Sequence, residues 1–206
     1  MESIGRWIGA SSETRVGTRV LTAFLFAVAT AACAQVWFRV WFTPIPVTLQ
    51  VFAVILSGLV LGSRWGALSQ LQYLAMGAMG LPVFAEWKSG PIAFAGPTAG
   101  YLIGFVFGAF LAGWVFERLQ SRPKIASWCG GIGGIAGIYL FGASWFAAWL
   151  AVASRTPVHA CIGSAWQLGI VPFIGIDLLK AALASSVALG GSRGRGLIRS
   201  LLGPTA

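Results

Sequence analysis

The sequence predicts an all-α integral membrane protein: a single-domain bundle of six transmembrane helices with both termini in the cytoplasm. Of its 206 residues, 57% are hydrophobic and only 9% are charged, whereas a soluble domain usually carries about 25% charged residues. At about 20 residues per spanning helix, this length fits six spans and leaves no room for a soluble catalytic domain. The apolar runs are continuous and lack the alternation typical of membrane β-barrel strands.

Six apolar stretches, each nearly free of charge, are the predicted spans. They are residues 20–38, 47–62, 66–81, 97–116, 125–152 and 163–190. The second and third are short for a hydrocarbon core of about 30 Å, so these helices are expected to tilt little, to break or to end below the surface. Residues 1–19 form the predicted cytoplasmic N-terminal segment and residues 191–206 a basic cytoplasmic tail.

The distribution of basic residues predicts the orientation of these spans. If there are six spans, ten basic residues fall on one side of the membrane, namely Arg6, Arg15, Arg19, Arg64, Arg118, Arg122, Lys124, Arg193, Arg195 and Arg199. Arg39, Lys88 and Arg155 fall on the other side. The excess of basic residues marks the cytoplasmic side, so both termini are expected there.

In the first span, Ala23, Ala27 and Ala31 recur every four residues. Such a stripe of small side chains lets another helix approach closely. From the pattern alone, the stripe either packs inside the bundle or docks a separate membrane subunit. The glycine pairs of the fifth span, Gly130 with Gly134 and Gly133 with Gly137, have the same two interpretations. For both sets the pattern favours packing inside the bundle.

The connection between the third and fourth spans, residues 82–96, is long for a loop and lies on the outer side. It holds Glu86, Trp87 and Lys88. A connection of this length is often functional, so this one is expected either to cover a cavity as a lid or to be a passive solvated loop.

The last span contains Asp177 and Lys180, which are costly inside a bilayer unless they are compensated. At positions i and i+3 they share one helical face, so they can neutralise each other and present an acceptor and a donor to one cavity. Pro172 is expected to free the carbonyl of Leu168 or to bend the helix. With Trp166 at the outer end, Asp177 would lie roughly 16 Å deep in a continuous helix. A polar-ligand site is favoured over a purely structural pair.

The remaining inventory is poor for catalysis. The chain has five carboxylates, one histidine and three widely spaced cysteines, with no phosphate-binding loop, nucleophile elbow or zinc-ligand motif. We therefore expect no catalytic residues, no metal site and no cofactor bound by this chain. Nucleic-acid binding is not expected either, because the net charge of +9 comes from short clusters between apolar runs.

Four motifs in order resemble the BioY family, the biotin-binding S components of energy-coupling factor (ECF) transporters. They are TPIPVTLQ at residues 43–50, GLPVF at 80–84, GPTAGYLIGF at 96–105 and DLLK at 177–180. The resemblance implies six membrane helices in the cell membrane and a cavity that captures biotin from outside. It also implies a transmembrane coupling (T) subunit as partner and two ATP-binding cassette subunits that use the ATP.

Carried over by position, the resemblance makes Asp177 and Lys180 the residues that contact the ligand. Its further ligand candidates are Trp87, Phe84 and Tyr101 as walls, Gln50 and Thr98 as polar partners, and Lys88 as a cation near the biotin carboxylate. The alanine stripe, Ala23, Ala27 and Ala31, resembles the surface that docks the coupling subunit.

Three alternatives remain at this point. The first is an S component for another vitamin, such as thiamine or riboflavin. The second is an intramembrane enzyme that uses Asp177 and Lys180 as acid and base, which the scarcity of other polar groups disfavours. The third is a structural membrane subunit, in which the pair is replaceable by apolar residues.

Overall fold

The computed structural model describes residues 2–201, and within them the side chains of residues 16–191. Arg6, Arg15, Arg193, Arg195 and Arg199, used above for the orientation, lie outside these described side chains, and residues 202–206 of the predicted tail lie outside the described chain. The described elements are α1 (Glu2–Ala34), β1 (Trp37–Phe38), β2 (Val47–Thr48), α2 (Gln50–Leu61), α3 (Ser63–Ala78), η1 (Ala85–Trp87), η2 (Pro91–Ala95), α4 (Ala99–Arg118), α5 (Pro123–Ser154), α6 (Val158–Gly169) and α7 (Val171–Leu201).

Within the described chain, four helical segments are long and apolar enough to cross a membrane. They are Val16–Ala34, Ala99–Arg118, Pro123–Ser154 and Val171–Gly191. Helices α2 and α3 have 12 and 16 residues, which corresponds to lengths of about 18 and 24 Å. Neither helix is long enough to span a hydrocarbon core of about 30 Å, unless the bilayer is thinner there or other parts of the protein surround the helix ends. The chain is therefore helical, with short second and third helices as the sequence predicts.

The first two predicted spans differ from the structure at the ends that face each other. Helix α1 ends at Ala34 instead of continuing to Phe38, and α2 begins at Gln50 instead of Val47. The residues in between form a small antiparallel sheet, in which Trp37 pairs with Thr48 and Phe38 with Val47. Apolar composition alone cannot separate a short strand from the end of a helix.

The last predicted span is divided into α6 and α7, with the break at Ile170. Because Pro172 has no N–H, the carbonyl of Leu168 loses its helical donor. The Thr43 hydroxyl donates to this carbonyl instead, at 2.8 Å, and the Tyr101 hydroxyl donates to the next one, that of Gly169, at 2.7 Å. The predicted effect of Pro172 is confirmed, whereas the continuous helix from Trp166 to Asp177 is wrong: Asp177 lies six residues, or about 9 Å, from the start of α7.

The glycine pairs of α5 pack inside the bundle against α4, as predicted. A Cβ atom on Gly134 would lie 3.2 Å from the carbonyl oxygen of Gly108 on α4, and one on Gly130 would lie 2.6 Å from that of Ala112. Larger side chains would push these helices apart. The close contact fixes α5, which carries Tyr139, relative to α4, which carries Tyr101.

The alanine stripe of α1 also lies inside the chain. Ala23 and Ala27 are completely buried and Ala31 is half-buried, on the same face as Thr30, which accepts a hydrogen bond from Gln70 of α3 at 3.3 Å. In the single chain, α2 and α3 cover Ala23 and Ala27, and docking of a partner through this stripe stays a prediction.

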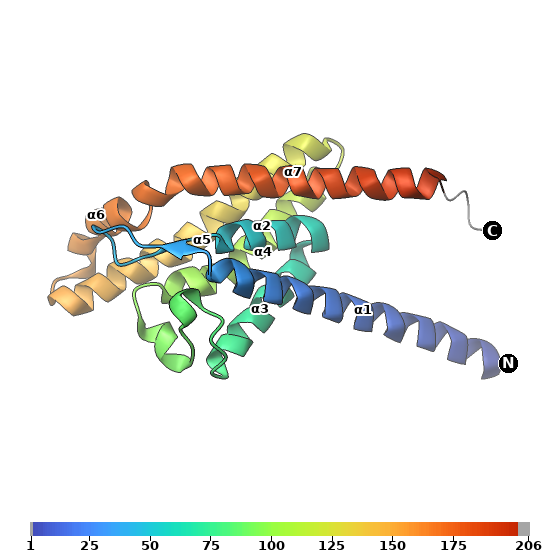
Figure 1. The fold of residues 1–206 in the computed structure, drawn as a ribbon, viewed down its shortest axis with the longest axis horizontal. Coiled ribbons are helices and arrows are strands. Elements are labelled where there is room, and N and C mark those ends of the chain that lie inside the picture. Colours follow the sequence, from blue (N-terminus) through green and yellow to red (C-terminus); the bar gives the residue numbers. More distant parts are fainter. Residues whose placement is uncertain (1, 202–206) are drawn as a thin grey trace.

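Figure 1 shows how these elements are arranged along the bundle. The start of α1 and the end of α7 point toward the same end of the molecule. At the opposite end lie α6, the β1–β2 sheet and the loop that contains η1 and η2. The helix α6, the small sheet and the 82–96 loop therefore lie together at one end of the bundle. The cavity described next lies beneath the β1–β2 connection and this loop.

Candidate functional site

A cavity of about 350 Å³ lies at this end of the bundle, within the range usual for small-molecule sites. Helices α2, α4, α5 and α7 form its walls, and the β1–β2 connection and the 82–96 loop cover it. Seven residues that the sequence identifies as ligand candidates line it: Gln50, Phe84, Lys88, Thr98, Tyr101, Asp177 and Lys180. Trp87 is 65% exposed and does not line the cavity in this structure, so its role as a wall stays a prediction.

Asp177 and Lys180 form the predicted buried pair on α7. The Lys180 Nζ atom donates to Asp177 Oδ1 at 2.7 Å, and the two side chains are 8% and 5% exposed, respectively. A buried charge without a partner is strongly destabilising, so each residue compensates the other. The pair is formally neutral, and both members still face the cavity.

Tyr139 of α5 completes this group and was missed in the sequence. Its hydroxyl donates to Asp177 Oδ2 at 2.6 Å, and its side chain lines the cavity. The sequence shows a tyrosine directly after the glycine-rich part of the fifth span, but it does not show which helix this side chain faces. The hydroxyl joins α5 to α7 across the cavity.

Gln50 lies at the start of α2 in a chain of polar contacts. Its Nε2 donates to the Tyr73 hydroxyl at 2.7 Å, which donates to the Val83 carbonyl at 3.2 Å. Its Oε1 accepts from the Thr48 hydroxyl at 2.9 Å. These bonds orient the Gln50 amide and connect α2 to α3 and to the 82–96 loop, so the predicted polar partner is held in place by the protein itself.

The Tyr101 ring lines the cavity, and its hydroxyl donates to the Gly169 carbonyl at the α6–α7 break. Gly142 of α5 makes room for the ring, since a Cβ there would lie 2.4 Å from it. Phe105 and Phe173 add apolar wall, and Thr98 lines the cavity directly before α4. This part of the cavity therefore offers flat apolar surfaces with few polar groups.

Phe84 anchors the loop that covers the cavity. Its side chain is 2% exposed and makes edge-to-face contacts with Tyr73 and Phe94, at centroid distances of 5.5 and 5.6 Å. It rests on Gly77, where a Cβ would lie 2.0 Å from the ring. The start of the loop is thus fixed by packing, which edge-to-face pairs strengthen by about 0.5–1.5 kcal/mol.

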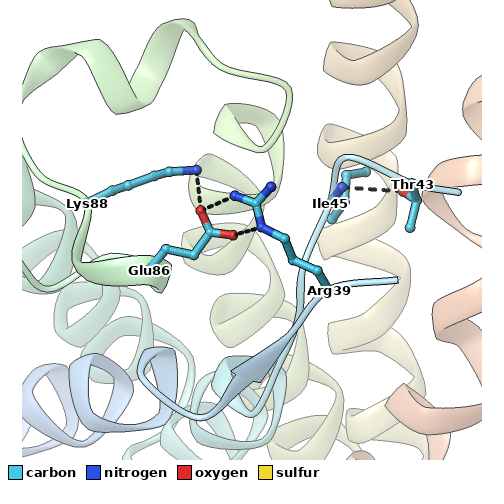
Figure 2. Close-up of polar contacts among 5 residues, drawn as sticks. All are labelled: Arg39, Thr43, Ile45, Glu86 and Lys88. Atoms are coloured by element: carbon cyan, nitrogen blue, oxygen red, sulfur yellow. Dashed lines mark hydrogen bonds and ion pairs between the residues drawn. The ribbon is translucent and has the colours of Figure 1, made fainter. Parts of the chain in front are cut away.

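Three charged side chains meet where Lys88 lines the cavity; we call Arg39, Glu86 and Lys88 the mouth cluster (Figure 2). Arg39 donates to both carboxylate oxygens of Glu86, at 2.5 and 2.6 Å, and Lys88 Nζ lies 2.7 Å from Oε2. The Glu86 side chain is 10% exposed, against 63% for Arg39 and 57% for Lys88. Hydrogen bonds from Arg39, and then those from Lys88, lower the pKa of Glu86 despite its partial burial.

The backbone beneath the mouth cluster is in an unfavourable conformation. Glu86 and Trp87 have φ values of 61° and 59°, in the left-handed region. For residues other than glycine, this conformation costs roughly 1–2 kcal/mol each. Contacts to the rest of the protein, of which the mouth cluster is one, must offset that cost.

The geometry therefore combines a neutral hydrogen-bonding pair on α7, apolar walls and an excess positive charge at the opening. Among the described residues, no group of three His, Cys, Asp or Glu side chains is placed to hold a metal ion. The arrangement can bind a small molecule that has a polar head, an apolar body and an anionic end.

Comparison with known proteins gives consistent results. The chain is 40% identical to the biotin transporter BioY of Thermotoga maritima over 154 residues, which cover 74% of this chain and 84% of that protein. It is 40% identical to the probable biotin transporter BioY of Pyrococcus horikoshii over 164 residues, 80% of this chain and 90% of that one. It is 36% identical to the biotin transporter BioY of Rhizobium etli, covering 81% and 88% of the two chains.

A solved structure shares the fold. The crystal structure of an S-component for biotin from an ECF-type ABC transporter superposes with a TM-score of 0.66 and 25% identity, covering 85% of this chain and 90% of that one. The sequence matches the BioY family over residues 10–196. With four helices able to cross a bilayer, and with this match over most of its length, the chain is a multi-pass membrane protein of the BioY family.

Proposed function

We propose that this protein takes up biotin, as the biotin-binding S component of an ECF transporter. The observation that carries the proposal is the distribution of charge in the cavity: Asp177 and Lys180 are paired and neutral on α7, while Lys88 lines the cavity close to its opening. The relatives described as biotin transporters support the same ligand.

The head of biotin suits the pair on α7. Its ureido ring has two N–H donors and one carbonyl acceptor. Asp177 can accept from the N–H groups and Lys180 can donate to the carbonyl, so that no polar group of the head is buried unpaired, which would cost about 1–3 kcal/mol each. Tyr101 and Phe84 cover the apolar bicycle, with Gln50 and Thr98 as further polar partners along the wall.

The other end of biotin suits the mouth. Arg39 and Lys88 carry two positive charges and Glu86 one negative charge, so the mouth cluster has a formal excess of +1. A ligand with one carboxylate neutralises this excess when it pairs with Lys88. Biotin has such a carboxylate, whereas riboflavin has none and the cationic thiamine would be repelled.

The remaining parts of the proposal concern the membrane and the partners. Both termini lie in the cytoplasm in this proposal, and the last of six spans consists of α6 and α7 together. A transmembrane coupling subunit and two ATP-binding cassette subunits provide the energy, since the S component of similar fold comes from an ABC transporter. ATP is used by those subunits, and this chain, in the plasma membrane, binds no cofactor and catalyses no reaction.

Calorimetric titration of the purified protein in detergent tests the ligand. Biotin is expected to bind with a one-to-one stoichiometry, and thiamine and riboflavin at the same concentrations are expected to give no heat of binding. Biotin methyl ester is the matched control for the mouth, because it keeps the ureido head and lacks the negative charge. Tight binding of thiamine or riboflavin, with none of biotin, would overturn the proposed ligand.

A further inference from the structure

Two connections cover the cavity: residues 39–46, which we call the strap, and residues 82–96, which we call the loop. Each contributes cavity lining, the strap through Pro44, Ile45 and Pro46 and the loop through side chains that include Lys88. A ligand that fills the cavity contacts both of them, so their displacement widens its path in and out. What holds them to each other and to the bundle therefore controls exchange.

The strap is fastened in its middle and at its first residue. In the middle, Thr43 accepts from the backbone N–H of Ile45 at 3.3 Å and donates to the Leu168 carbonyl at the α6–α7 break. At the first residue, Arg39 reaches across to the loop and donates to both oxygens of Glu86 (Figure 2). Arg39 thus joins the strap to the loop.

The loop is poised to change conformation if that contact is lost. Glu86 and Trp87 are held in the left-handed region, which their side chains disfavour. Gly80 and Gly90 flank them with φ values of 97° and 79°, and no atom lies within 4 Å of a Cβ built on either one. The loop is anchored by Phe84 but has free space at both turning points, so contacts rather than backbone preference keep it over the cavity.

We propose that the Arg39–Glu86 pair is a latch that sets how fast the ligand leaves, with Glu86 as a positioning residue that also directs Lys88 toward the cavity. This inference rests on the proposed function and adds the control of exchange to it. The latch joins two segments that close over the site, and it is built from a bidentate pair whose acidic member is mostly shielded from water. It therefore resists opening more than an ordinary surface ion pair does.

Dissociation of radiolabelled biotin from the purified full chain, chased with excess unlabelled biotin, tests the latch. Arg39→Gln and Glu86→Gln should each speed dissociation by about 3- to 10-fold. Net charge alone predicts opposite effects for these two variants, because the first makes the mouth less positive and the second more positive. A latch predicts the same direction for both.

Two further variants complete the design. Arg155→Gln removes an exposed cation of the same type from the predicted outer side and should leave the rate within about twofold of wild type. The reversed pair, Arg39→Glu with Glu86→Arg, keeps the net charge and restores the bridge, so it should dissociate more slowly than either single variant. If Arg39→Gln is not recovered in monodisperse form, Arg39→Lys replaces it. This variant keeps the positive charge but cannot donate two parallel hydrogen bonds to Glu86, so biotin should also dissociate from it faster than from wild type.

Opposite changes in the two single variants, unchanged rates, or a reversed pair as fast as the singles would overturn the latch. Failure of the wild-type chain to bind labelled biotin would instead overturn the proposed function. The two failures are therefore distinguishable in one set of measurements.

Discussion

The carboxylate of Asp177 has room for more hydrogen bonds than the protein gives it. Each oxygen accepts one bond, from Tyr139 on one side and Lys180 on the other, whereas a carboxylate offers about four acceptor positions. The two protein donors fix the orientation of the group, and the positions left over face the cavity. Asp177 is thus oriented before the ligand arrives, which lowers the entropic cost of binding.

Asp177→Asn and Lys180→Met are each expected to weaken biotin binding by about 10- to 150-fold. Either change leaves a polar group of the ligand or of its neighbour without a partner in a low-dielectric cavity, at about 1.5–3 kcal/mol. Calorimetric titration measures the loss.

Because a single change also leaves one buried charge unpaired, the protein yield and melting temperature are needed as controls. The double variant Asp177→Leu with Lys180→Leu removes both charges and should fold at least as well as either single one. Unchanged biotin affinity in that folded double variant would mean that the pair is only structural.

Tyr139→Phe tests the residue that joins α5 to α7. The ring is kept and the hydroxyl that donates to Asp177 is lost, so the free energy of unfolding should fall by about 1.5–3 kcal/mol. Thermal melting in detergent without ligand reports the change. Tyr101→Phe is a comparison of the same type at the α6–α7 break, and a Tyr139→Phe protein as stable as wild type would show that this hydroxyl contributes nothing.

The mouth cluster should be insensitive to pH over the neutral range. Arg39 and then Lys88 lower the pKa of Glu86 below its ordinary value of 4.5. Since the folded pKa is below the unfolded one, the stabilisation is fully present above about pH 4.5 and is lost as the pH falls through the folded pKa. The difference in melting temperature between wild type and Glu86→Gln should therefore stay constant from pH 8 to 5 and shrink only at lower pH. A decrease between pH 7 and 5 would contradict the lowered pKa.

At the scale of the element, α1 shows why the alanine stripe could not be assigned from its spacing. In a soluble protein the polar face of a helix marks the side away from the core, but a membrane helix is apolar on both its lipid-facing and its protein-facing sides. Phe24, Leu25 and Val28 are exposed while Ala23 and Ala27 are buried. Small side chains are favoured on the buried face here because α3 approaches it closely.

Ala27→Trp is accordingly expected to reduce the yield of folded protein, because there is no space for the larger ring beside α2 and α3. The matched control is Ala29→Trp on the exposed face of the same helix, which should fold normally. Size-exclusion profiles and melting temperatures of the two variants decide the point. An Ala27→Trp protein that folds like the control would contradict this close packing and would favour the stripe as a docking surface.

The other elements also differ in how well they could be predicted from the sequence. The long apolar helices and the pair on α7 were predictable, since hydropathy and intramembrane charge act locally. The β1–β2 sheet was not, because its strands are apolar like the helix ends beside them. Tyr139 and the partnership of Arg39 with Glu86 were not predictable either, because both depend on how segments far apart in the sequence come together.

At the scale of the whole molecule, the orientation in the membrane is open to a direct test. In a variant without the native cysteines, a single cysteine at Ser89 in the loop should react with an impermeant reagent added to intact cells. A cysteine at Ser121, between α4 and α5, should react only after the cells are opened. The basic residues Arg118, Arg122 and Lys124 predict that this connection lies in the cytoplasm. The reverse pattern of labelling would invert the proposed topology.

The break between α6 and α7 has a consequence for how this protein can diversify. Pro172 causes the break, and hydrogen bonds from Thr43 and Tyr101 hold it in place. The part of α7 that carries Asp177 and Lys180 therefore starts from a rigid support. The mouth, in contrast, is closed by exposed cations around one carboxylate. Substitutions that weaken the Arg39–Glu86 pair but keep the charge of the mouth, such as Arg39→Lys, can therefore change how long a ligand stays bound with little effect on which ligand is chosen. Residence time and selectivity can then evolve separately.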